Sequence, residues 1–136
     1  MKKKKLYVLI ACEESQAVMK AFRKLTIKGV KIEAYSCDLL ECSGGQPQHH
    51  FQQDVFKIIK DKGGRTQSNE PVSVPRWDLM IAHPPCTYLA VSGARWFYDP
   101  ADKDKPVDQR RPHPKYPNRR KDQKEAIQFF MNLVKI

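Results

Sequence analysis

The amino-acid sequence predicts an α/β fold with a mostly parallel sheet of about four strands and flanking helices. A β-rich apolar run at residues 6–11 is followed by a helical apolar pattern at 17–25 and a second β-rich run at 31–38. A short continuous apolar run at 79–82 is typical of a strand buried on both faces of a parallel sheet. The 136 residues are enough for one domain with a proper core, so we expect a single domain spanning residues 1–136.

The first strand, residues 6–11, is expected to be central because it is apolar and β-rich. After the turn at 12–15, apolar side chains recur at helical spacing until Gly29, which is expected to close the helix. Residues 31–38 form the second predicted strand, ending at Asp38. This β-α-β order implies parallel strands joined by a right-handed crossover.

The middle of the chain is expected to add a short strand and a short helix. Residues 42–47 read as a loop because they contain two glycines and a proline. A short third strand at 49–54, ending at Asp54, and a short helix at 55–60 follow. The polar insert at 61–75 is expected to form a surface loop or small hairpin that contributes little to the core.

The fourth strand carries the clearest candidate site. Pro84 cannot donate a hydrogen bond to a sheet, so the strand must end near His83. Cys86 then lies on a stiff loop just beyond the strand's carboxyl end, where ligands and catalytic groups gather in open α/β sheets. The alternative is a buried structural cysteine. The flanking prolines and the aromatic residues that follow favour a site position.

The last part of the chain is basic and then helical. Residues 99–121 are rich in charge and proline, which predicts a mobile basic loop, and residues 122–136 carry apolar side chains at helical spacing. Phosphate contacts and base stacking are the functions that such a region favours. The candidate nucleic-acid-binding residues are Arg95, Trp96, Arg110, Arg111, Arg119 and Arg120.

Composition points to an anionic partner. The net charge is +10, from 25 basic and 15 acidic residues, which favours nucleic acid and equally fits a solubilising surface. No apolar run approaches the roughly 18 residues that a membrane span needs, and residues 1–5 read as a basic tail rather than a signal peptide. The four cysteines are expected to be reduced thiols in a cytoplasm.

Acidic residues are expected at the carboxyl ends of three strands, beside the cysteine loop. Glu13 and Glu14 stand where a dinucleotide-binding fold has glycines, and suit either the helix dipole or a cationic ligand such as S-adenosylmethionine. Asp38 is placed to accept hydrogen bonds from ribose hydroxyls, and Asp54 is placed to accept one from an adenine amino group. For a single aspartate, capping a helix or turn is the more frequent role. The joint order of the acidic residues and Cys86 at successive strand ends favours a cofactor site.

Four potential metal ligands lie close together in the sequence: Cys37, Cys42, His49 and His50. Their spacing matches no common zinc pattern, so no metal is expected.

These residues together resemble a known family. The chain resembles, over residues 6–88, the amino-terminal part of a DNA (cytosine-5) methyltransferase, in a divergent form similar to methyltransferase-like proteins of bacteriophages and prophages. The resemblance implies a truncated Rossmann-like sheet in the order 3-2-1-4 and S-adenosylmethionine as cofactor. It implies that Cys86, preceded by Pro85, is the nucleophile that attacks cytosine C6. His83 belongs to the same catalytic loop. Cys12, Glu13, Glu14, Asp38 and Asp54 fall at cofactor-binding positions.

The chain also departs from that family. The glycine-rich first motif is replaced by residues 11–16, Thr87 stands where glutamine is usual, and the chain ends before the family's Glu-Asn motif and target-recognition region. A fourth strand at the sheet edge is expected to be covered by the carboxyl-terminal helix, a second copy or a protein partner. The rival hypothesis is a phage-encoded anti-defence module, such as an anti-CRISPR-like inhibitor, that binds a nuclease or its nucleic acid in the bacterial host cytoplasm.

Overall fold

The computed structural model describes residues 4–84 and 97–136. By internal contacts the chain divides into two compact units, Met1–His83 and Pro84–Ile136, and each is described here by itself. The single domain over residues 1–136 stays a prediction.

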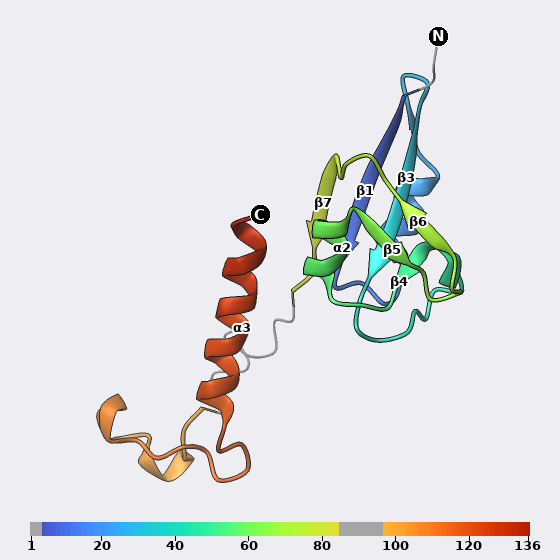
Figure 1. Ribbon diagram of the computed structural model, residues 1–136. Helices are drawn as coiled ribbons and strands as arrows, with labels where there is room; N and C mark the ends of the chain where they lie inside the picture. Colours follow the sequence, from blue (N-terminus) through green and yellow to red (C-terminus); the bar gives the residue numbers. More distant parts are fainter. Residues whose placement is uncertain (1–3, 85–96) are drawn as a thin grey trace. The chain divides into compact units, whose positions relative to one another are not determined.

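The first unit is built on a mixed sheet. Strand β1 (Lys5–Ala11) lies between β3 (Val30–Cys37) and β7 (Leu79–Ala82), and all three are parallel (Figure 1). The two-residue β4 (His50–Phe51) pairs in parallel with the end of β3. The predicted α/β class with a mostly parallel sheet is confirmed. The Rossmann-like order stays a prediction.

The start of β3 carries a strand that the sequence did not predict. Strand β2 (Thr26–Ile27) pairs antiparallel with β3, and the two residues between them, Lys28 and Gly29, both have positive φ, 50° and 79°. Two consecutive positive φ values are characteristic of a tight hairpin turn. Gly29 therefore turns a hairpin, and the prediction that it closes the first helix is wrong, because α1 (Ala17–Arg23) ends well before it.

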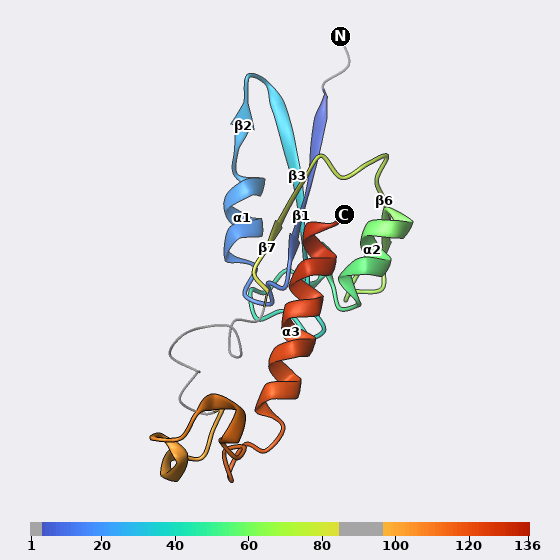
Figure 2. The ribbon, with the colours of Figure 1, turned by 90° about the vertical axis from the view of Figure 1, so that its left-hand side faces the viewer.

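The two helices of this unit cover opposite faces of the sheet (Figure 2). On the α1 side, Met19 is fully buried in a cluster with side chains of β1 and β3, namely Val8, Ile10, Ile32 and Ala34. Helix α2 (Val55–Asp61) lies on the other face of the sheet (Figure 2). Its Ile58 carbonyl accepts a hydrogen bond from Nε1 of Trp77 at 3.2 Å. Both predicted helices are confirmed.

The segments around α2 are short. The predicted strand at 49–54 is reduced to β4, which follows a 3₁₀ turn at Pro47–His49. The polar insert forms the hairpin of β5 (Gly63–Arg65) and β6 (Pro71–Ser73), one of the two forms expected. It adds one buried apolar residue, Val74, just after β6.

The second unit contains the long helix α3 (Arg119–Val134), close to the helix predicted at 122–136. The basic segment before it was expected to lack regular structure. It instead carries 3₁₀ turns at Pro100–Asp102 and Val107–Gln109 and a bridge between Tyr98 and Pro112. Its mobility stays a prediction. No helix among the described residues is long and apolar enough to cross a membrane.

Candidate functional site

The candidate site lies at the carboxyl edge of the sheet, between β1 and β7. The chain passes from β1 to β3 on one side, whereas β7 pairs on the other side of β1, so the connections diverge at this point. Ligands of open α/β sheets bind in the crevice at such a point. The backbone N–H of His83 donates to the Ala11 carbonyl at 3.0 Å, which fixes the end of β7 beside the end of β1.

Glu13 is the central side chain of this edge and is only 4% exposed. Its Oε1 accepts the backbone N–H groups of Val18 and Met19, at 3.0 and 3.1 Å, in the first turn of α1. Its Oε2 is buried and accepts no hydrogen bond from the residues that the structure describes. Burying a carboxylate oxygen without a hydrogen-bond donor costs free energy, so Oε2 is a candidate acceptor for a donor group on a ligand.

His83 stands next to that oxygen. Its Nε2 lies 3.3 Å from Oε2 of Glu13, within ion-pair distance but without the alignment of a hydrogen bond. The pair attracts electrostatically only when the imidazole carries a proton. The His83 side chain is 47% exposed, so the pair is reached from solvent through His83. The sequence placed both residues at this edge but did not predict that they pair.

The turn that carries Glu13 is strained at both ends. Cys12 and Gln16 have φ values of 60° and 61°, which cost on the order of 1 kcal/mol or more for residues other than glycine. Strain of this kind is kept where surrounding contacts enforce it. The buried Gln16 amide makes such contacts, because its Nε2 donates to the Gln46 carbonyl at 2.8 Å and to Ser36 Oγ at 3.2 Å.

The loop after β3 is fixed onto this turn. Ser43 donates its backbone N–H to the Glu14 carbonyl at 2.9 Å, and its hydroxyl donates to the Glu14 carboxylate. Gly44 approaches so closely that a Cβ atom there would lie 2.5 Å from the Ser15 carbonyl oxygen. We call residues 43–46 the clamp loop. The sequence predicted a loop at 42–47 but not its contact with this turn, although the Gly44-Gly45 pair was a signal of close backbone approach.

The two aspartates both lie where the sequence placed them, beyond β3 and β4, and both cap local structure. Asp38 Oδ1 accepts the Leu40 N–H at 2.9 Å, and Asp54 Oδ1 accepts the Phe56 N–H at 3.2 Å at the start of α2. These are the capping roles that were the alternative to cofactor binding. Their role in cofactor binding stays a prediction.

The thiols near the edge are held in the neutral form. Burial raises the pKa of Cys12 to about 11, and the negative charge of Asp38 adds to the effect. Burial likewise raises the pKa of Cys37 to about 12. The Cys37 Sγ donates to the Gln53 carbonyl at 3.3 Å. Neither thiol is a nucleophile at neutral pH, because the thiolate is the reactive form.

Three of the four residues that could bind zinc, Cys37, His49 and His50, have side-chain hydrogen-bond partners. His50 uses both ring nitrogens, at 2.8 Å from Ser36 Oγ and 2.9 Å from the Leu40 carbonyl. Over residues 4–84 and 97–136, no three His, Cys, Asp or Glu side chains gather in a way that would hold a metal ion.

Four of the predicted site residues, Pro85, Cys86, Arg95 and Trp96, lie outside the described residues. The other residues that were predicted to bind nucleic acid belong to the second unit. Arg111 forms a bidentate pair with the buried Asp102, with both nitrogen–oxygen distances 3.0 Å. This pair holds the pKa of the Asp102 carboxyl well below its usual range.

The remaining arginines contact backbone and rings. Arg110 donates to the carbonyls of Lys103 and Lys105, both at 2.9 Å. Arg119 is 9% exposed, with its Cζ 6.0 Å from the Phe97 ring centre, and Arg120 lies 5.7 Å from the same ring. The structure thus gives Arg110 and Arg111 roles inside the protein.

No protein-family model, curated protein or solved structure matches this chain. The resemblance to cytosine-5 methyltransferases therefore stays an expectation from the sequence, and the functional argument rests on the geometry of the described residues.

The capping role of Glu13 gives a first prediction. Glu13→Ala removes the acceptor of two N–H groups, so the Val18 and Met19 amides should exchange with solvent about tenfold faster or more. Glu13→Gln keeps an acceptor and should stay close to wild type. Hydrogen exchange followed by NMR measures both, with Asp54→Ala, which should release only Phe56, as the matched control. Equal protection in wild type and Glu13→Ala would contradict the assignment.

The thiol chemistry gives a second prediction. With a pKa of about 11, Cys12 should react slowly with iodoacetamide at pH 8 and about ten times faster with each unit up to pH 10. Asp38→Asn should speed the reaction of Cys12, because removing the negative charge lowers the pKa of the thiol. Mass spectrometry of the alkylated peptides measures the rate, and Asp104→Asn in the second unit is the control. Unchanged Cys12 rates in Asp38→Asn would refute the electrostatic cause.

Proposed function

We propose that the chain is a methyltransferase-like domain that binds S-adenosylmethionine at the carboxyl edge of its sheet and acts on DNA, with Cys86 as the nucleophile. The observation that carries the proposal is the buried Oε2 of Glu13, which accepts no hydrogen bond within the described part of the chain. S-adenosylmethionine carries a sulfonium and an ammonium group. A buried carboxylate oxygen at the point where the strand connections diverge suits a cationic ligand of this kind.

The residues of the edge fit the cofactor in chemical type. Glu13 and the exposed imidazole of His83 would face its cationic end, and Asp38 would accept ribose hydroxyls. The bond from the Leu40 N–H already fixes the orientation of the Asp38 carboxylate. The neutral thiol of Cys12 would line the site without adding charge, since its pKa is raised to about 11. The bound cofactor would supply an activated methyl group.

The reaction would also need a thiolate and a proton acceptor. Attack by Cys86 on a cytosine requires the base to leave the duplex and enter a pocket. His83 precedes Cys86 by three residues in the chain, and its Nε2 lies 3.3 Å from Glu13 Oε2, so an imidazole that takes up a proton would be attracted electrostatically by the carboxylate. General acid–base help of this kind contributes roughly 10²- to 10⁴-fold.

The clamp loop favours a second candidate function. It packs against the β1–α1 turn with no room for a side chain at Gly44, at the position where a nucleotide-binding fold admits phosphates. A methyltransferase-like fold that has lost its cofactor would serve as a phage-encoded anti-defence module, and the net charge of +10 suits binding to a host nuclease or its nucleic acid.

Calorimetric titration separates the two functions. Wild type should bind S-adenosylmethionine, and Glu13→Gln should weaken binding about tenfold or more, because a charge-assisted hydrogen bond is worth about 1.5–3 kcal/mol. Asp38→Ala should abolish tight binding, and Glu70→Gln, on the β5–β6 hairpin, is the matched control. No heat at millimolar cofactor would end the cofactor proposal and leave the binding module.

The edge of the sheet leads us to propose a homo-oligomer or a complex with a protein partner. Within the described strands β7 pairs only with β1, and Leu79 at its start is 46% exposed. Apolar edge strands are normally covered. Light scattering at micromolar concentration should therefore give a mass above that of one chain, and Leu79→Lys should lower it. A clean monomer would exclude the homo-oligomer.

A further inference from the structure

The basic segment of the second unit separates into arginines that hold the protein together and cations that remain at the surface. Between residues 109 and 121 there are six basic residues and no acidic one. Asp102 binds Arg111 and also lies 3.2 Å from the Lys105 Nζ, and Arg110 binds two backbone carbonyls. Arg110 and Arg111, the first two of the six cations, are therefore engaged within the fold, and Arg119 is itself only 9% exposed, whereas Lys115 is exposed.

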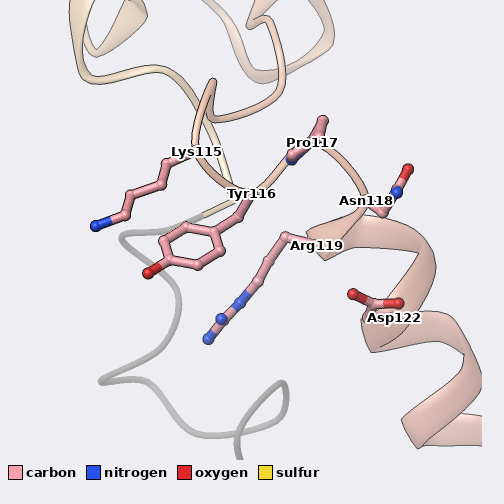
Figure 3. Close-up of a pocket in the computed structure, with 6 residues that line it drawn as sticks. All are labelled: Lys115, Tyr116, Pro117, Asn118, Arg119 and Asp122. Carbon is pink, nitrogen blue, oxygen red and sulfur yellow. The ribbon is translucent and has the colours of Figure 1, made fainter.

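A pocket of about 280 Å³ lies where this segment enters α3. Figure 3 shows Lys115, Tyr116 and Arg119 extending to the same side of the chain. The Lys115 Nζ lies 5.9 Å and the Arg119 Cζ 5.7 Å from the centre of the Tyr116 ring. The remaining lining residues are Pro117, Asn118 and Asp122.

Tyr116 is held in place by the chain on both sides of it. Its backbone N–H donates to the His113 carbonyl at 3.0 Å, and its own carbonyl accepts the Arg119 N–H at 3.2 Å. Its side chain is nevertheless on the surface, with the residue 36% exposed. The pocket thus combines a fixed, accessible aromatic ring with the exposed cation of Lys115 and the nearly buried guanidinium of Arg119.

Those features fit one part of a nucleic-acid strand. Strands without a fixed sequence preference are bound by cations that contact phosphates and by aromatic rings on which bases stack. The volume is just below the range of about 300–1,000 Å³ in which whole drug-sized ligands are enclosed, so it suits one unit of a longer chain better than a free cofactor.

We propose that the pocket of Lys115, Tyr116 and Arg119 binds a phosphate of a nucleic-acid strand, with a base stacked on Tyr116. This assignment rests on the proposed action on DNA and names residues for it. It adds Lys115 and Tyr116 to the contact surface. Arg111 is paired with Asp102 and Arg110 is bonded to two carbonyls, and their role in nucleic-acid binding stays a prediction.

The test is fluorescence anisotropy of a labelled single-stranded oligonucleotide and its duplex, from about 50 to 200 mM salt. Lys115→Ala should weaken binding about three- to tenfold and reduce the slope of log affinity against log salt by roughly 0.7–0.9, the value of one lost phosphate contact. Lys135→Ala removes the same charge from the other end of α3 and should do neither. Tyr116→Leu should weaken binding at least about fivefold, whereas Tyr116→Phe keeps the stacking ring and should not.

The outcomes distinguish this inference from the proposed function. If wild type binds the oligonucleotide but Lys115→Ala behaves like Lys135→Ala and Tyr116→Leu like Tyr116→Phe, the pocket assignment is overturned and action on DNA stands. If polyglutamate competes as well as an oligonucleotide of equal charge, the surface is an unspecific anion attractor and the assignment is again overturned. If wild type binds no oligonucleotide, both fall. Binding of S-adenosylmethionine should be the same in all four variants.

Discussion

The Glu13 carboxylate joins three elements of the first unit, and the geometry of the candidate site depends on it. Helices are usually capped by the residue just before their first turn, yet that residue here, Gln16, makes no side-chain cap. Glu13 takes over this role from further back, binding Val18 and Met19 through one oxygen. Its other oxygen is thereby directed towards His83 at the end of β7.

Because Glu13 caps the helix, the Gln16 side chain is available for another purpose. It accepts the Gln46 N–H and donates to the Gln46 carbonyl, so it binds both polar groups of one backbone residue in the clamp loop. These bonds stabilise the left-handed conformation that Gln16 adopts. The turn, the clamp loop and the helix start are therefore interdependent: a ligand that displaced the clamp loop would also disturb the first turn of α1.

Local patterns were enough to predict most elements of the fold. The apolar runs at β1, β3 and β7 and the helical spacing in α1, α2 and α3 were read correctly, because each follows from burial over a few consecutive residues. β4 is shorter than expected because a 3₁₀ turn ends at His49 and Asp54 already caps α2, so that only His50 and Phe51 pair with β3. The turn at Lys28 and Gly29 was missed because the glycine was assigned to the preceding helix.

The candidate site could be predicted in position but not in its contacts. The carboxyl ends of parallel strands share an edge, so acidic residues at the ends of β1 and β3 had to lie near one another. The pairing of Glu13 with His83 has no such local cause, since 70 residues separate them and only the β1–β7 register brings them together. The cap contact of Asp54 with Phe56 is local, but sequence alone did not separate it from cofactor binding because an aspartate after a strand suits both roles.

The second unit shows how little a net charge says about individual side chains. Arg110, Arg111, Arg119 and Arg120 looked equivalent in the sequence, yet Arg111 is the partner of a buried carboxylate and Arg119 is itself nearly buried. A guanidinium whose charge is neutralised by a carboxylate within the fold contributes less to counterion release when a strand approaches. The attraction of this unit for an anion therefore depends less on its paired arginines than on where its exposed cations gather, and Lys115 is such a cation beside an accessible ring.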